Sequence, residues 1–128
     1  MGLSCSSSNH RPQIQKINEI KLPIMIAENF INIIGQLELS DDIPDELRYN
    51  LNQLIILRSK LAHCVVRIQR RNSHYHFIEL ENELTNVINF VHIVIQDFQL
   101  EVYFPLITSY LIEELDIYKQ NSKQQVQI

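Results

Sequence analysis

Arg58 and His63 lie five positions apart in a segment with the apolar spacing of a helix. Histidine changes its charge near neutral pH and can transfer a proton, whereas arginine presents planar donors that match phosphate oxygens. This pair therefore favours chemistry on a phosphodiester. His63 is a candidate general acid or base, and Arg58 is a candidate stabiliser of the charge that develops on a phosphorane.

The pair lies in a stretch of the chain that has no acidic residue. Residues 47–78 contain six Lys or Arg and three His, and the rest of the chain has five Lys or Arg against fifteen Asp or Glu. The formal net charge of -4 thus combines +6 in this window with -10 elsewhere. A local positive field attracts a phosphate backbone, so the window favours RNA as the partner.

Long helices are expected to position these residues. Only two Gly and four Pro occur, and 45 % of the residues are apolar, which favours an all-α chain over a β-sandwich. Apolar spacing of three and four predicts helices at residues 13–20, from Pro23 to before Ser40, from about Pro44 to Arg70, from about 77 to 98, and at 106–118. Residues Val91–Ile95 also fit a strand. The expected architecture is an up-and-down bundle of four long helices plus a short C-terminal helix.

Composition divides the chain into one domain and two polar ends. We expect a disordered leader at 1–10, a helical domain at 11–118 and a polar tail at 119–128. The two cysteines, Cys5 and Cys64, cannot build a disulfide framework or a four-ligand zinc site. No secretory signal or apolar run of about 18 residues is present, so we expect a cytoplasmic protein without a membrane span.

The segment around the pair resembles the hallmark motif of the HEPN superfamily, in which Arg, a polar residue and three more positions precede His. The phrase here is Leu57-Arg58-Ser59-Lys60-Leu61-Ala62-His63. The resemblance implies a HEPN-like helical bundle and a metal-independent endoribonuclease without a cofactor, such as a toxin or defence component with an antitoxin or other partner protein. It also implies a homodimer in which two copies of the motif line one cleft.

The resemblance assigns catalytic roles to Arg58, His63 and the polar residue Ser59. We expect the other basic side chains of the window to contact RNA phosphates. They are Lys60, Arg67, Arg70, Arg71 and His76.

Two departures from the family pattern concern single positions. The family most often has Asn, Asp or His at the position of Ser59, and Val65 replaces the Tyr that one toxin subgroup carries. Modification of a tyrosine at position 65 is therefore excluded.

Several alternatives remain open from the residues alone. Arg71 and His76 repeat the spacing with an Asn after the Arg, but in an expected turn. Arg58 could form a structural ion pair, and His63 could be an ordinary helix histidine. The basic window could belong to a catalytically inactive HEPN-like module that binds RNA, a nucleotide or a protein.

Two other features of the sequence have simpler interpretations. We interpret Cys64 as a small core residue, because no carboxylate or amide lies near it to build a Cys-His relay. The start Met1-Gly2-Leu3-Ser4-Cys5-Ser6 matches an N-myristoylation pattern. A lipid anchor through Gly2 is an alternative that we do not favour, because the pattern is short.

Overall fold

The computed structural model describes the backbone of residues 21–127 and the side chains of residues 21–122. The chain is helical at residues 21–34 and in α2 (Asp45–Arg70), α3 (His74–Asp97), α4 (Leu100–Tyr103) and α5 (Pro105–Gln127). No strand occurs in this part of the chain, so the expected all-α class is confirmed and the strand alternative for Val91–Ile95 is wrong. The expected leader at 1–10, the expected helix at 13–20 and Gly2 lie outside the described residues.

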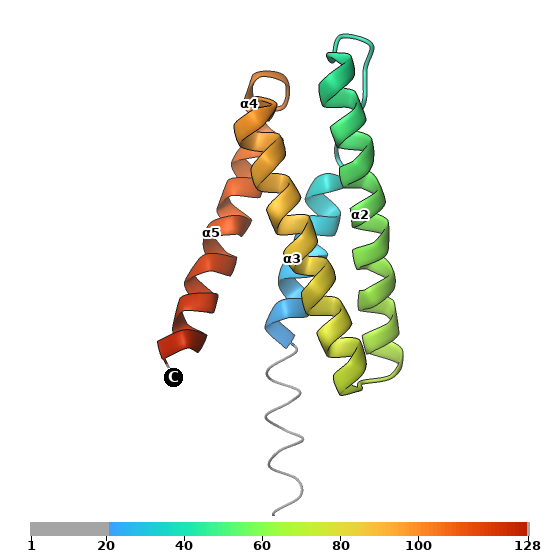
Figure 1. Cartoon of the computed structure of the whole chain (residues 1–128), viewed down its shortest axis with the longest axis vertical. Coiled ribbons are helices and arrows are strands. Elements are labelled where there is room, and N and C mark those ends of the chain that lie inside the picture. The colour runs from blue at the N-terminus through green and yellow to red at the C-terminus, as the bar shows by residue number, and fades with distance from the viewer. Residues whose placement is uncertain (1–20, 128) are drawn as a thin grey trace, which may run out of the picture.

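The long helices alternate in direction to form a helical bundle (Figure 1). Helix 21–34 and α3 run upward in the view, and α2 and α5 run downward. A turn at residues 71–73 joins α2 to α3, and these two helices pack against each other. The one-turn helix α4 lies at the top, where α3 meets α5.

Local signals explain where α2 begins and which face it buries. Pro44 precedes the helix and Asp45 and Glu46 occupy its first turn, where carboxylates favour the positive end of the helix dipole. Its buried residues follow the expected spacing of three and four. They are Leu47, Leu51, Leu54, Leu61, Cys64, Val65 and Ile68. The other face of α2 is left for solvent or a partner.

The start of α3 and the connection to α5 depend on particular backbone positions. The hydroxyl of Ser73 accepts a hydrogen bond from the backbone N–H of His76, which starts α3 at His74, three residues before the expected Phe77. Gln99 lies between α3 and α4 and has a left-handed φ of 53°. Pro105 occupies the first position of α5, as a proline in that place should.

The last helix is longer than expected. We predicted a short helix ending at Tyr118, but α5 continues to Gln127. Residues 119–127 contain neither Gly nor Pro and are rich in Gln and Lys, which have good helix propensity. A polar composition without an apolar stripe therefore did not end the helix.

The core lies where the inner faces of the helices meet. Its large side chains with at most 2 % exposure include Phe30, Leu54, Leu84, Val91 and Leu111. The side-chain amide of Asn29 donates to Glu114 Oε1 at 3.0 Å, which ties helix 21–34 to α5. None of the helices in the described range has both the length and the apolar character needed to cross a membrane.

Candidate functional site

Arg58 lies against the end of helix 21–34. Its Nε donates a hydrogen bond to the backbone carbonyl of Ile31 at 2.7 Å, and the same carbonyl accepts from the N–H of Gly35 at 3.0 Å. A Cβ on Gly35 would lie 3.0 Å from Arg58 Nη2, so the guanidinium packs closely on this glycine. A cation at the carbonyl end of a helix is favoured by the helix dipole. This contact explains why an arginine occurs on the core stripe of α2.

His63 lies on the exposed side of α2, together with Ser59 and Lys60. Within residues 21–122, its imidazole forms no hydrogen bond or ion pair with Arg58 or with any other residue. The structure therefore places the two motif side chains in different surroundings of one helix. Arg58 contacts a backbone carbonyl, whereas His63 is open to a ligand or to a second subunit.

Two of the expected RNA contacts, Arg67 and His76, face a carboxylate of α3. Arg67 Nε donates to Glu79 Oε1 at 3.0 Å, and His76 Nδ1 lies 3.8 Å from the same oxygen. The hydrogen bond from Arg67 to Glu79 raises the pKa of Arg67. Glu79 is the first acidic residue after the acid-free window, so a neighbouring helix supplies the negative charge that the window lacks.

Three other cations of the window are exposed to solvent and have no acidic partner in the described part of the chain. They are Lys60, Arg70 and Arg71. The alternative pair, Arg71 and His76, lies across the turn and the start of α3. His76 is only 21 % exposed and sits beside Glu79, so its surroundings differ from those of His63.

Cys64 is a buried core residue, as its sequence context predicts. Its side chain is 1 % exposed, and Arg67 Nη2 lies 3.4 Å from the sulfur. Burial raises the pKa of the Cys64 thiol, an effect that Arg67 partly opposes. A buried thiol with a raised pKa is a poor nucleophile.

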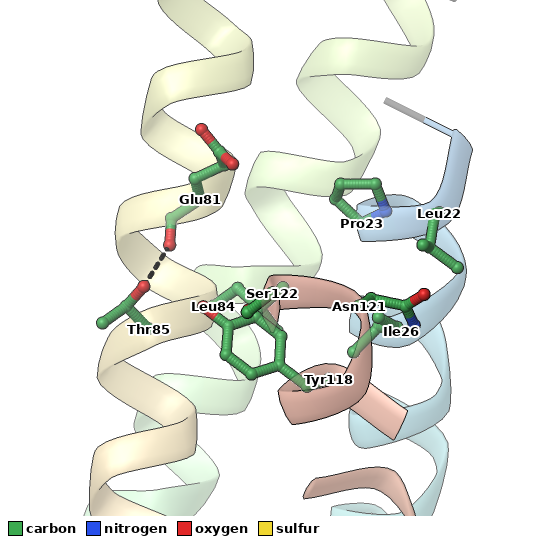
Figure 2. A pocket seen from close by; sticks show the side chains of 9 residues that line it. All are labelled: Leu22, Pro23, Ile26, Glu81, Leu84, Thr85, Tyr118, Asn121 and Ser122. Atoms are coloured by element: carbon green, nitrogen blue, oxygen red, sulfur yellow. Dashed lines mark hydrogen bonds between the residues drawn. The ribbon is translucent and has the colours of Figure 1, made fainter. Parts of the chain in front are cut away.

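A pocket between helix 21–34, α3 and α5 was not foreseen from the sequence. Its volume is about 80 Å³, and Figure 2 shows the nine side chains that surround it. Leu22, Ile26 and Leu84 supply apolar surface, and Asn121 and Ser122 supply polar groups. Three segments distant in the sequence form it, so no local pattern could have indicated this pocket.

The wall on the α3 side of the pocket is tied to the helix backbone. Thr85 Oγ1 donates to the backbone carbonyl of Glu81 at 2.9 Å, and Figure 2 marks this bond. The hydroxyl therefore has a partner inside α3, and its donor is not available to a molecule in the pocket.

The described side chains include no group of three or more His, Cys, Asp or Glu residues able to hold a metal ion. His74 and His76, at the start of α3, belong to no such group in this part of the chain. No family model, curated protein or solved structure matches the chain.

Proposed function

We propose that the protein is a metal-independent endoribonuclease of the HEPN type that acts as a homodimer, in the cytoplasm, as a toxin or defence component. The resemblance of the Leu57–His63 phrase to the family motif motivates the activity. An antitoxin or another partner protein would restrain it. The all-α bundle is compatible with such a domain.

The observation that carries the proposal is the open position of His63. A general acid or base must come within hydrogen-bond distance of the proton that it transfers, and an exposed imidazole without a protein partner can do so. Lys60, Arg70 and Arg71 add exposed positive charge along the same helix and the turn after it. This face of α2 would bind phosphates and present His63 to the ribose.

The reaction that we propose is an internal transfer of the phosphoryl group. The 2′-oxygen of the ribose forms a bond to phosphorus and the bond to the 5′-oxygen breaks, which leaves a 2′,3′-cyclic phosphate and a 5′-hydroxyl. In a homodimer, His63 of one subunit accepts the 2′-hydroxyl proton, and His63 of the other donates a proton to the leaving 5′-oxygen. Ser59 is exposed one turn before His63 and would hydrogen-bond the bound ribose or phosphate.

Arg58 would stabilise the phosphorane through its terminal nitrogens. Its Nε is bonded to Ile31, whereas neither Nη atom donates a hydrogen bond within the described residues. The contact with Ile31 would hold the guanidinium in one orientation, as electrostatic stabilisation of a transition state requires.

The test compares three purified proteins on a mixed RNA pool in EDTA. They are the wild type, His63→Ala and the matched control His92→Ala, which removes an exposed histidine from α3. We expect the wild type and the control to release products with 2′,3′-cyclic phosphate ends, and His63→Ala to lose at least about 100-fold in rate. Equal cleavage by His63→Ala, or no cleavage by a folded dimeric wild type, would contradict the proposal.

A catalytically inactive RNA-binding module is the second candidate. This candidate is favoured by the hydrogen bond from Arg58 Nε to the Ile31 carbonyl, because an arginine that binds the C-terminal end of helix 21–34 need not contact RNA. Such a module would bind RNA with a steep dependence on salt and would weaken on loss of Lys60, Arg70 or Arg71. The loss of His63 would then leave the affinity unchanged.

A further inference from the structure

Tyr75 presents an aromatic ring to solvent beside the basic end of α2. Its exposed fraction is 70 %, and it lies in the first turn of α3, just after the turn at residues 71–73. An exposed ring next to exposed cations can stack on a nucleobase while the cations bind phosphates. Tyr75, Arg70 and Arg71 offer this combination.

Contacts among neighbouring side chains hold the Tyr75 ring in place. The ring centroids of Tyr75 and His76 are 5.6 Å apart and the planes meet at 66°, an edge-to-face arrangement. His76 in turn faces Glu79, and Glu79 is bonded to Arg67 of α2. A ring held by its neighbours loses less conformational entropy when it stacks on a ligand. The side chains of Arg67 and His76 thus have a positioning role here.

The charges near Tyr75 favour an anionic ligand. Arg70 and Arg71 are exposed and precede Tyr75 by five and four residues. Five residues span at most about 18 Å, so one short oligonucleotide can reach both arginines and the ring. No acidic residue lies between positions 47 and 78, and the nearest one, Glu79, is already paired with Arg67.

We propose that Tyr75 stacks on an unpaired base of single-stranded RNA whose phosphates contact Arg70 and Arg71. A base in a duplex is stacked between its neighbours and offers no open face to a tyrosine, so the site selects single-stranded segments. The inference rests on the proposed RNA function and specifies its substrate class. Arg70 and Arg71 supply attraction to any phosphate, and Tyr75 supplies the preference for unpaired bases.

The experiment measures binding without cleavage. Fluorescence anisotropy follows the dissociation constants of a labelled oligouridine of about 12 nucleotides and of an RNA duplex of similar length, in EDTA and in a His63→Ala background. The variants are Tyr75→Ala, Tyr75→Phe and the control Tyr49→Ala. Tyr49 is 65 % exposed, close to the value for Tyr75, but it lies near Asp45 and Glu46.

We expect Tyr75→Ala to weaken oligouridine binding about tenfold and to leave duplex binding unchanged. Tyr75→Phe keeps the ring and should bind within about twofold of the parent protein. Tyr49→Ala should have no effect. The slope of affinity against salt should be the same in all these proteins, because no charge is removed.

Four results would overturn the inference. If oligouridine binds but Tyr75→Ala does not weaken it, the ring is not a stacking site, and the proposed ribonuclease function still stands. An equal loss for duplex and single strand would show that Tyr75 does not select unpaired bases. Tighter binding to vesicles of anionic lipid than to either RNA would assign the basic turn to a membrane. If no RNA binds to the folded parent, the proposed function fails as well.

Discussion

Alanine at position 35 tests how much the Arg58 contact stabilises the end of helix 21–34. The added Cβ would lie 3.0 Å from Arg58 Nη2 and 3.2 Å from Nε, so the guanidinium must shift by a few tenths of an ångström, which weakens its bond to Ile31. The backbone itself accepts alanine, because no glycine in the described residues has a positive φ. The Cβ would also lie 3.2 Å from the Ile31 carbonyl oxygen, so the substitution acts on both partners of the Arg58 contact.

The size of the effect follows from two opposing contributions. The bond from the charged Nε to the Ile31 carbonyl is 2.7 Å long and partly buried. Loss of a hydrogen bond to a charged group costs about 1.5–3 kcal/mol of stability. Alanine in place of glycine stabilises the protein by about 0.4–1 kcal/mol, because it lowers the conformational entropy of the unfolded chain. Because the guanidinium need shift only slightly, part of this bond remains, and we expect Gly35→Ala to lower the free energy of unfolding by at most about 1–2 kcal/mol.

The assay is a double-mutant cycle measured by urea unfolding at constant pH. In an Arg58→Ala background the contact is already absent, so Gly35→Ala should be neutral or should stabilise the protein by up to about 1 kcal/mol. Lys60→Ala removes an exposed cation from the same helix and provides the control, with which Gly35→Ala should be additive. If Gly35→Ala destabilised the Arg58→Ala protein as much as the wild type, Arg58 would not be the cause.

Two further predictions concern buried groups. Burial raises the pKa of Glu114 above its ordinary value of 4.5, although the bond from Asn29 lowers it in part. The native state therefore favours the protonated carboxyl, and the cost of the charged form is present at neutral pH and disappears as the pH falls below 4.5. Glu114→Gln should raise the urea midpoint at pH 7 and lose this advantage at about pH 4. A constant difference between the two pH values would contradict this reasoning. For Cys64, a Cys5→Ser protein should react with a disulfide reagent at least about 100-fold more slowly when native than when unfolded in urea, and fast reaction of the native protein would show that the thiol is accessible.

Features fixed by neighbouring residues were predictable from the sequence. The start of α2 after Pro44 and its leucine stripe agree with the structure, and so does the position of Cys64 in the core. The last helix was expected to begin at residue 106, and it begins at Pro105. The end of α5 was not, because the polar residues after Tyr118 signal exposure and do not signal the end of a helix.

The candidate site was only partly predictable. The sequence identified Arg58 as a candidate site residue, but its partner, the Ile31 carbonyl, lies 27 positions away. The window of positive charge was clear in the sequence. The structure shows that Arg67, one of its cations, donates a hydrogen bond to Glu79 of α3. No pattern in the sequence pointed to Tyr75, because the exposure of an aromatic residue near a turn depends on how the helices pack.

The sequence by itself determined that the described chain is helical, which face of α2 lies inside and the charge of the window, because helical spacing and composition are local properties. Tertiary structure decided which faces meet. It placed Arg58 on Ile31, joined Asn29 to Glu114 across 85 positions, and closed a pocket among three helices. Such contacts depend on how side chains of distant segments fill a shared volume, and no periodicity within one segment specifies that.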